Sequence, residues 1–213
     1  MHRSLQQMGF YEERVLPRVV EVTCGGKRME QVRRPALVGL SGTIVELGFG
    51  SGSNVGLYPS EVERVLAVEP STLARERAGT KIAAHPKPPI EFIGLDGAQL
   101  PLEDGSVDAV LSTWTLCTIP DVERALAEVR RVLRVGGSLH FLEHGISMDS
   151  KVARWQRRVE PVQKKIGGGC HLTRDAPEMI VAAGLRIDQL ARFTIGPRVF
   201  ASMSSGVAIK DDA

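Results

Sequence analysis

The sequence TIVELGFGSGSNVG at residues 43–56 places a short β-branched run directly before three glycines on alternate positions. A β-branched run favours a strand, and glycine permits both the positive φ angles of a sharp turn and the close approach of a ligand to the main chain. A strand that turns into a helix through such a loop is a common way to bind a nucleotide-like cofactor or a phosphate. Which of these ligands the loop binds has to be inferred from the residues that follow it at set distances.

The chain after residue 43 alternates between strand patterns and helix patterns. The predicted strands are RVLAVE at 64–69, IEFIGL at 90–95, VDAVLS at 107–112 and SLHFLEH at 138–144. Helical patterns lie between them, in the Glu/Arg/Ala-rich segment from Ser71 and in DVERALAEVRRVL at 121–133. This alternation predicts an α/β fold, with a parallel sheet that is covered by helices on both faces.

The segment 121–133 has the clearest helical pattern. Asp121 suits the N-cap position, and Gly136-Gly137 is expected to stop the helix. Its apolar residues recur at helical spacing, at Val122, Ala125, Leu126, Val129, Val132 and Leu133. Such a stripe predicts a helix that packs against one face of the sheet.

The segment at 145–174 is too long for a simple connection between a strand and a helix. It holds three glycines at 167–169 and a run of basic residues, at Lys151, Arg154, Arg157, Arg158, Lys164 and Lys165. We expect an inserted segment on the substrate side, near the carboxyl ends of the strands, where open α/β sheets bind their ligands. A second helix is expected to begin through Thr173, and the runs 185–193 and 204–210 are predicted as two late strands.

At 213 residues, with 43% apolar and 24% charged residues, the chain fits one soluble globular domain, 1–213, with a substantial core. We divide it into an N-terminal helical cap at 1–42, a cofactor-binding half at 43–144, the inserted segment at 145–174, and the last helix and strands at 175–213. From its position alone, the cap is expected to cover the site with Phe10 and Tyr11.

Basic and acidic residues nearly cancel, with 27 Lys and Arg against 25 Asp and Glu and a formal net charge of +2. This balance gives no bulk electrostatic reason to expect nucleic acid or an acidic membrane as the partner, so we expect a small molecule. The basic run at 151–165 could steer an anionic substrate or make a peripheral contact with a lipid surface, and a solvated helix face explains it more simply. No apolar stretch reaches the length of a membrane span and the N-terminus has no signal-peptide core, so we expect a cytoplasmic protein.

The three cysteines, Cys24, Cys117 and Cys170, are widely spaced and form no CxxC pair. This number and spacing indicate neither a disulfide framework nor a metal site such as a zinc site. We expect a reducing compartment, with Cys24 and Cys117 as small packed residues rather than reactive thiols.

The glycine loop departs from the dinucleotide-binding fingerprint, in which the third glycine lies three places after the second. Gly48, Gly50 and Gly52 fall on alternate positions, and Ser53 occupies the place where that third glycine is expected. An NAD-dependent oxidoreductase therefore remains only as an alternative.

Two carboxylates follow the next predicted strands. Glu69 ends the second strand, where a carboxylate can accept two hydrogen bonds from the ribose of either kind of cofactor. Asp96 follows the third strand in the context GLDGAQLPL, where a carboxylate can accept a hydrogen bond from the exocyclic amine of an adenine. Both positions indicate a cofactor that carries an adenosine group.

Five motifs in order and at normal spacing resemble those of the class I S-adenosylmethionine-dependent methyltransferases: VELGFGSG, AVEP, GLDGAQLP, DGSVDAVLSTWTLC and RVLRVGG. The resemblance implies a Rossmann-like fold, with a mainly parallel seven-stranded sheet, helices on both faces and an antiparallel last strand.

More narrowly, SGSNVGLYP, STWTLCTI, FLEHG and RWQRRVEPVQKKIGGGCHLTR resemble the methyltransferase-like thiol S-methyltransferases, from about residue 43 to the end. That family has membrane-tethered members and many bacterial relatives. The tethered members begin with a hydrophobic anchor that this sequence does not show. Its substrates can therefore differ from those of the tethered members. The quinone-pathway C-methyltransferases are more distant relatives and lack a segment like GGGCHLTR.

The resemblance implies S-adenosyl-L-methionine as the cofactor and S-adenosyl-L-homocysteine as the product. It implies that the glycines meet the methionine part, that Glu69 holds the ribose and that Asp96 contacts the adenine. The implied cofactor-binding residues are Glu46, Gly48, Gly50, Gly52, Asn54, Glu69, Pro70, Asp96, Gly97 and Trp114. Trp114 could border the sulfonium with its ring face, and core packing explains this tryptophan almost as well.

Methyl transfer from sulfur is an in-line displacement, so the protein mainly aligns the acceptor and excludes water. A thiol acceptor has to be present as thiolate, and His144, at the end of the fifth predicted strand, is the first candidate for the base. Cys170, His171 and Arg174 are further candidates, on a glycine-rich loop that could close over the acceptor. The alternatives are a structural histidine at 144 and a tight turn with Thr173 as a helix cap.

We therefore expect methyl transfer to a small acceptor, with a thiol sulfur favoured. The alternatives are C- or O-methylation of a quinol- or phenol-type metabolite, and a protein that binds the cofactor without catalysis. An enzyme acting on nucleic acid is disfavoured, because STWTLC at 112–117 is not a base-flipping motif and no excess basic face is indicated. The sequence predicts no particular oligomeric state.

Overall fold

The computed structural model describes residues 26–196 and 202–212, and Phe10, Tyr11 and Cys24 lie outside them. The helices are α2 Lys27–Leu37, α3 Thr72–Ala84, α4 Val122–Val132, α5 Ser150–Ile166 and α6 Ala176–Ala182. The strands are β1 Gly42–Leu47, β2 Val62–Val68, β3 Ile90–Gly94, β4 Val107–Thr113, β5 Leu133–His144, β6 Arg186–Thr194 and β7 Ser202–Ile209. The predicted cover of the site by the first residues therefore stays a prediction.

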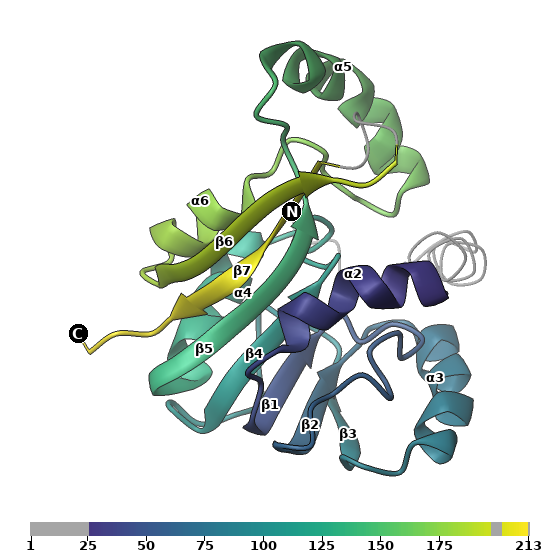
Figure 1. Cartoon of the computed structure of the whole chain (residues 1–213), viewed down its shortest axis with the longest axis vertical. Helices are drawn as coiled ribbons and strands as arrows, with labels where there is room; N and C mark the ends of the chain where they lie inside the picture. Colours follow the sequence, from purple (N-terminus) through teal and green to yellow (C-terminus); the bar gives the residue numbers. More distant parts are fainter. Residues whose placement is uncertain (1–25, 197–201, 213) are drawn as a thin grey trace.

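The strands form one seven-stranded sheet in the order β3-β2-β1-β4-β5-β7-β6 (Figure 1). Strands β1 to β5 are parallel, and β7 runs antiparallel to both of its neighbours, β5 and β6. The register places Glu46 of β1 between Ala67 of β2 and Leu111 of β4. The predicted α/β fold, with a mainly parallel sheet and an antiparallel last strand, is confirmed.

The sheet is covered on both faces, so each inner strand buries both sets of its side chains. On β1, Val45 and Leu47 belong to one apolar cluster, which includes residues of α4 and α6. Ile44 points to the other cluster, which includes residues of α2 and α3. Burial on two faces explains why the central strands read as continuous apolar runs rather than as alternating patterns.

Helix α4 has the predicted bounds to within one residue at each end, but the predicted stop signal at Gly136-Gly137 is wrong. Asp121 is the N-cap, and its side chain accepts a hydrogen bond from the Arg124 amide. The helix stops at Val132 and not at Gly136-Gly137, because Leu133 is already extended and pairs with Val107 of β4. The need to pair β5 with β4 outweighs the helical pattern at this point.

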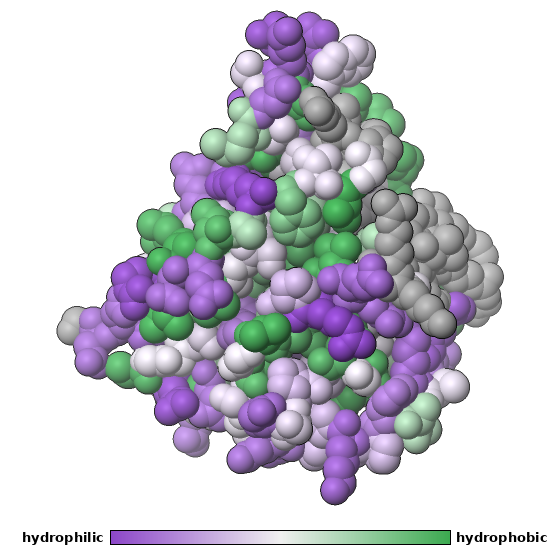
Figure 2. All heavy atoms as spheres, in the orientation of Figure 1, coloured by the Kyte–Doolittle hydropathy of each residue, from purple (hydrophilic) through white to green (hydrophobic). Residues whose placement is uncertain are grey.

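Helix α5 forms most of the predicted insertion and projects beyond the end of the sheet (Figure 1). Figure 2 shows hydrophilic side chains gathered at this end of the molecule. Trp155, Val162 and Ile166 are nevertheless exposed on the same helix. None of the described helices is long and apolar enough to cross a bilayer. The predicted peripheral contact with a lipid surface stays a prediction.

The helix after the insertion was predicted to begin at Thr173, and this prediction is wrong. Asp175 is the N-cap of α6, and its side chain accepts a hydrogen bond from the Glu178 amide. The Thr173 amide instead donates to Glu160 of α5 at 2.8 Å. Thr173 therefore ties the loop to α5 and does not cap a helix.

The carboxyl ends of the five parallel strands meet at one edge of the sheet. The residues that follow them include Gly48 after β1, Glu69 after β2, Asp96 after β3 and Trp114 after β4, and His144 ends β5. The strand order reverses direction between β1 and β4, and open α/β sheets bind their ligands at such a point. The fold thus places most of the predicted site residues along one edge.

Replacement of Leu126 by alanine tests the core under α4. Leu126 is 1% exposed within the cluster that joins α4 to the sheet. We expect Leu126→Ala to lower the free energy of unfolding by about 2–5 kcal/mol, because the cavity is only partly refilled. Urea denaturation measures the change. Arg124→Ala, on the exposed side of the same helix, should stay within about 0.5 kcal/mol of the unchanged protein.

Candidate functional site

The glycine loop after β1 requires glycine for two physical reasons. Gly48, Gly50 and Gly52 have φ angles of +64°, +59° and +73°, a region that other residues rarely adopt. A Cβ on Gly48 would also lie 2.2 Å from Thr115 Oγ1, so the loop packs directly on the turn that follows β4. A bare backbone at this place lets two neighbouring strand ends and a ligand come close together.

Glu69 links the end of β2 to the glycine loop. Its carboxylate accepts hydrogen bonds from the Gly50 amide at 2.7 Å and from the Ser71 amide at 2.8 Å. Burial raises the pKa of this carboxyl, and the two amide donors oppose the rise. Each oxygen keeps a second lone pair. The predicted contact with a ribose is therefore compatible with this geometry.

Asp96 and Gly97 lie at the end of β3, where the sequence predicts an adenine contact. Asp96 Oδ1 accepts a hydrogen bond from the Ala98 amide at 2.8 Å, which fixes the carboxylate at the start of a turn. Both residues are partly exposed at the sheet edge, and Pro70, after Glu69, is exposed. The positions agree with a cofactor that lies across the ends of β1, β2 and β3.

Glu46 and Asn54, both predicted near the cofactor, belong to a buried polar network. Asn54 Nδ2 donates to Glu46 Oε1 at 2.9 Å, and the Tyr58 hydroxyl donates to the other carboxylate oxygen. Glu46 is 1% exposed, and burial raises its pKa from 4.5 to about 7. The carboxyl is thus held inside the protein by side chains from the glycine loop and the helical turn after it.

Arg33 of α2 completes this network, and no sequence motif indicated it. Its Nη1 donates to Asn54 Oδ1 at 3.0 Å and to Thr113 Oγ1 at 2.7 Å. Its guanidinium carbon lies 4.5 Å from the centroid of the Trp114 ring, so a cation already covers one face of that ring. Trp114 has a φ of +54°, which is uncommon outside glycine. The predicted contact of Trp114 with a sulfonium stays a prediction, and it concerns the ring face that Arg33 does not cover.

His144, Cys170 and Cys117 meet at the ends of β4 and β5, and we call these three residues the Cys–His cluster. His144 Nε2 lies 2.7 Å from Cys170 Sγ. The cluster's two sulfur atoms and a histidine nitrogen all lie within 4.8 Å of one another. Cys117 is 2% exposed and Cys170 is 8% exposed. The structure therefore joins two predicted catalytic residues with a cysteine that was expected to be a packing residue.

Hydrogen bonds inside the cluster shift the pKa values in opposite directions. A hydrogen bond from Cys117, together with the contact to His144, lowers the pKa of Cys170 to about 5, although burial opposes this. The hydrogen bond with Cys170 and burial raise the pKa of the Cys117 thiol. Burial lowers the pKa of His144, but the bond and charge of Cys170 outweigh burial and hold it above its ordinary value. The arrangement favours a thiolate on Cys170 beside an imidazolium.

Two other predicted catalytic residues hold the cluster together. The His171 amide donates to the Cys117 carbonyl at 2.9 Å. Arg174 Nη1 donates to the carbonyls of Leu116 and Ile119 at 2.6 and 2.8 Å. Arg174 thus acts as a positioning residue for the turn that carries Cys117.

The loop GGGCHLTR is a tight turn that is fastened to α5. The Gly169 amide donates to the Lys164 carbonyl at 2.9 Å. His171 Nδ1 lies 3.5 Å from Glu160 Oε1. These contacts favour the interpretation as a turn, and closure over the acceptor stays a prediction.

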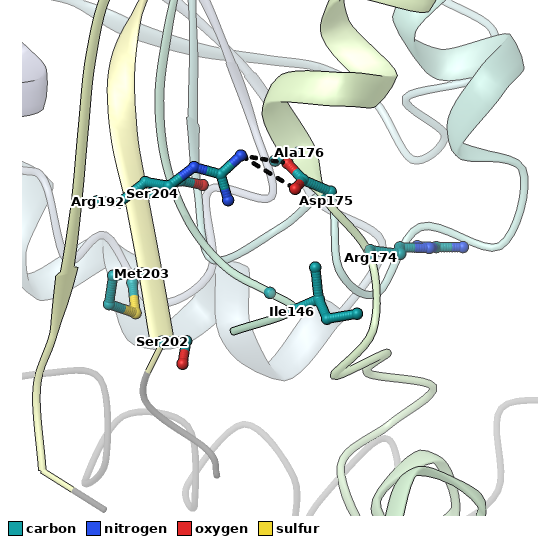
Figure 3. Close-up of a pocket in the computed structure, with 9 residues that line it drawn as sticks. Ile146, Arg174, Asp175, Ala176, Arg192, Ser202, Met203 and Ser204 are labelled. Atoms are coloured by element: carbon teal, nitrogen blue, oxygen red, sulfur yellow. Dashed lines mark hydrogen bonds and ion pairs between the residues drawn. The ribbon is translucent and has the colours of Figure 1, made fainter. Parts of the chain in front are cut away.

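A small pocket lies next to the last residues of β5 (Figure 3). Gly145, Ile146 and Ser202 line it together with the start of α6. Arg192 Nη2 lies 3.0 Å from both carboxylate oxygens of Asp175 at this pocket, which joins β6 to α6. Gly145, one residue beyond His144, lines the pocket, and His144 itself does not.

Comparison with known sequences finds similarity to methyltransferases. Residues 45–141 match the family model described as a methyltransferase domain. The human thiol S-methyltransferase TMT1B is 36% identical over 160 residues, which are 70% of this chain and 65% of that protein. The rat thiol S-methyltransferase TMT1B is 38% identical over 136 residues, 62% of this chain and 55% of that protein. The chain thus spans less than two thirds of the length of these relatives.

A second group of relatives matches over a shorter stretch. The ubiquinone/menaquinone biosynthesis C-methyltransferase UbiE of Methylobacterium nodulans is 42% identical over 81 residues, 37% of this chain and 31% of that protein.

Among solved structures, a possible histamine N-methyltransferase from Thermotoga maritima has a TM-score of 0.64 at 21% identity, and the match covers 91% of this chain and 94% of that one. The structural likeness supports the fold alone.

Replacement of Gly48 by alanine tests the contact between the glycine loop and the turn after β4. The new Cβ would overlap Thr115, and the φ of +64° would be strained. We expect a loss of about 2 kcal/mol or more in the free energy of unfolding, measured by urea denaturation. Gly79→Ala is the matched control, because no heavy atom lies within 4 Å of its added Cβ. It should leave stability unchanged or raise it by about 0.5–1 kcal/mol. Equal losses in both variants would contradict the prediction.

Replacement of Glu46 by glutamine tests the burial of its carboxyl. Since the pKa is 4.5 in an ordinary setting and about 7 in the fold, the folded protein binds more protons than the unfolded chain between these values. The free energy of unfolding should therefore fall as the pH rises through this window, and Glu46→Gln should reduce the fall. Denaturation at several pH values measures it. Glu61→Gln, at an exposed position, is the control, and an unchanged slope in Glu46→Gln would refute the assignment.

Proposed function

Because the chain carries a methyltransferase domain and has the class I methyltransferase fold, we propose that it transfers the methyl group of S-adenosylmethionine to the thiol sulfur of a small molecule. The observation that carries this proposal is the Cys–His cluster, which lies at the same sheet edge as the glycine loop. Similarity to the thiol S-methyltransferases supports the choice of a thiol.

The cofactor belongs on the side of β1, β2 and β3. Their carboxyl ends present the glycine loop, Glu69 and Asp96, in the order methionine, ribose and adenine. The contact of Glu69 with the Gly50 amide supports this placement, because it joins the ribose position to the methionine position. S-adenosylhomocysteine is the product that leaves this side.

The acceptor belongs on the side of β4 and β5, across the point where the strand order reverses. The turn after β4 carries Cys117, and β5 ends with His144. We assign His144 and Cys170 as catalytic residues that hold the acceptor, with His171 and Arg174 as positioning residues. The positive charges of Arg174 and of a protonated His144 favour the thiolate form of an acceptor, and a thiolate on Cys170 opposes it.

The reaction itself needs no covalent enzyme intermediate. The acceptor sulfur forms a bond to the methyl carbon while the bond from that carbon to the sulfonium breaks, and the electron pair stays on the sulfur of S-adenosylhomocysteine. Holding both partners in line replaces a collision in water, and such alignment reaches effective molarities of about 10⁵ M or more. The contact between Gly48 and Thr115 sets the two sides of the site against each other.

The free cysteines of the described part of the chain fit a reducing compartment, which supports a cytoplasmic location.

C- or O-methylation of a quinol or phenol is the alternative reaction, and the match to a quinone-pathway C-methyltransferase supports it over a shorter stretch. A protein that binds the cofactor without catalysis would show saturable binding and no turnover.

Turnover of methyl-labelled S-adenosylmethionine tests the proposal, with a panel of small thiols, phenols and quinols as acceptors. We expect label in thiols, and a loss of about 10²-fold to 10⁴-fold in kcat/KM for His144→Ala. Cofactor affinity should stay unchanged, because His144 lies on the acceptor side.

His85→Ala is the matched control for this variant, since His85 is an exposed histidine at the end of α3. It should keep full activity. Label that enters only phenols or quinols would replace the thiol proposal with the alternative reaction. Tight binding of the cofactor with no labelled acceptor in the panel would contradict the proposed activity.

A further inference from the structure

We propose that the Cys–His cluster binds one zinc ion, and that the open position on the ion takes the acceptor thiolate. The first half of this proposal stands on the geometry of the cluster alone. The second half rests on the proposed thiol methylation. In the part of the chain that the structure describes, Cys117, His144 and Cys170 are the one group of three such residues whose donor atoms lie this close together.

Among the described residues, the ligand set is that of a catalytic zinc site. Two cysteine sulfurs and one histidine nitrogen suit zinc, and the three described ligands leave the fourth tetrahedral position open. A structural zinc site would be closed by a fourth side chain, and the described part of the chain places none beside these three. A soft sulfur ligand from a substrate thiol suits the same ion.

The distances come close to those that zinc needs. Bonds of about 2.3 Å to sulfur and about 2.1 Å to nitrogen separate two sulfurs by about 3.8 Å, and a sulfur from a nitrogen by about 3.6 Å. All three donor atoms lie within 4.8 Å of one another. The His144–Cys170 pair, at 2.7 Å, is in hydrogen-bond contact and has to open by about 1 Å. Cys170 follows Gly168 and Gly169, both at positive φ, so it lies on a turn and not inside a regular element.

The cluster is assembled before any ion arrives. Arg174 holds the turn that carries Cys117 through two carbonyls, and the His171 amide joins this turn to the loop that carries Cys170. Gln163 Nε2 lies 4.0 Å from Cys170 Sγ, on the side of α5. Such outer contacts orient metal ligands and are a regular part of metal sites.

Two buried polar atoms beside the cluster have no partner among the described residues. These are His144 Nδ1 and Glu143 Oε2. Glu143 is 0% exposed, and its other oxygen accepts hydrogen bonds from Ser112 Oγ and from the Thr115 amide. Buried polar atoms are rarely left unpaired. Neither atom faces Cys170, since His144 turns Nε2 toward that sulfur, so both remain available for a further hydrogen bond beside the proposed ion.

The charges of the ligand set suit the ion. A zinc ion with two thiolates and a neutral imidazole has no net charge. Metal binding to such ligands releases protons.

In the proposed reaction the ion holds the acceptor sulfur. The thiol gives up its proton to solvent as its sulfur takes the open position, and zinc stabilises the resulting thiolate. That sulfur then attacks the methyl carbon, and the sulfonium leaves as the thioether of S-adenosylhomocysteine. The zinc ion keeps its charge throughout, so no oxidant or reductant is needed.

Cobalt substitution tests the metal site directly. The full chain is freed of metal with a chelator, dialysed and titrated with Co²⁺, whose visible absorption reports tetrahedral geometry and whose near-ultraviolet absorption reports thiolate ligation. We expect one equivalent of Co²⁺ bound in tetrahedral geometry. Cys117→Ser and Cys170→Ser should each lose about half of the thiolate absorption, and the double variant should lose all of it. His85→Ala, at an exposed histidine at the end of α3, is the control and should keep the full signal.

A second measurement uses the unchanged protein, so it does not depend on whether the cysteine variants fold. In the unchanged protein, Zn²⁺ should slow the alkylation of Cys117 and Cys170 by about tenfold or more, and a chelator should restore it. A cobalt spectrum without thiolate bands, or bands that persist in the double variant, would overturn the site.

Turnover separates this proposal from the proposed function. Removal of the metal should lower kcat/KM for thiols by about tenfold or more, and Zn²⁺ should restore it. Metal binding without methylation of any thiol would leave the site in place and refute the function. Methylation of thiols at the same rate without metal would leave the function in place and refute the catalytic role of the ion.

Discussion

The close packing of the glycine loop on the turn after β4 is the constraint on which the rest of the site depends. Gly48 has no side chain, and a Cβ there would overlap Thr115, so the main chains of two neighbouring strand ends come together at this point. Thr115 Oγ1 also donates to the Leu47 carbonyl at 3.1 Å, which holds the turn against the end of β1. Because the turn also contains Cys117, this one contact sets the glycine loop and the Cys–His cluster at a fixed distance.

A buried polar network extends this constraint to the N-terminal helix. Arg33 reaches from α2 to Asn54 after the glycine loop and to Thr113 at the end of β4. Polar groups in a protein interior are costly unless they are hydrogen-bonded, so these partners have to stay together. Glu46 lies in the same network, and its carboxyl is held by Asn54. The position of α2 therefore depends on the same strand ends that present the cofactor residues.

The Cys–His cluster is built differently, from segments that share no regular element. The turn after β4, the end of β5 and the loop after α5 each supply one residue of the Cys–His cluster. Arg174 joins the first and third of these segments through main-chain carbonyls. Charged groups that donate several hydrogen bonds suit this task, because one guanidinium can satisfy more than one carbonyl. The inserted segment therefore contributes to the site through its last residues, while the exposed face of α5 lies outside it.

The sequence by itself determined the order of strands and helices, the glycine turn, and the acidic residues Glu69 and Asp96 at the strand ends. These features are local, since the periods of strands and helices and the backbone freedom of glycine act within a few residues. Helix α4 ends within one residue of its predicted end, but the signal that stops it was predicted wrongly, because pairing of Leu133 with Val107 in the sheet ends the helix before Gly136-Gly137. Only the tertiary structure decided the place of Arg33 and the meeting of His144 with Cys170, which lie 26 residues apart. Their contact depends on hydrogen bonds between distant segments, and no periodicity in the chain records such bonds.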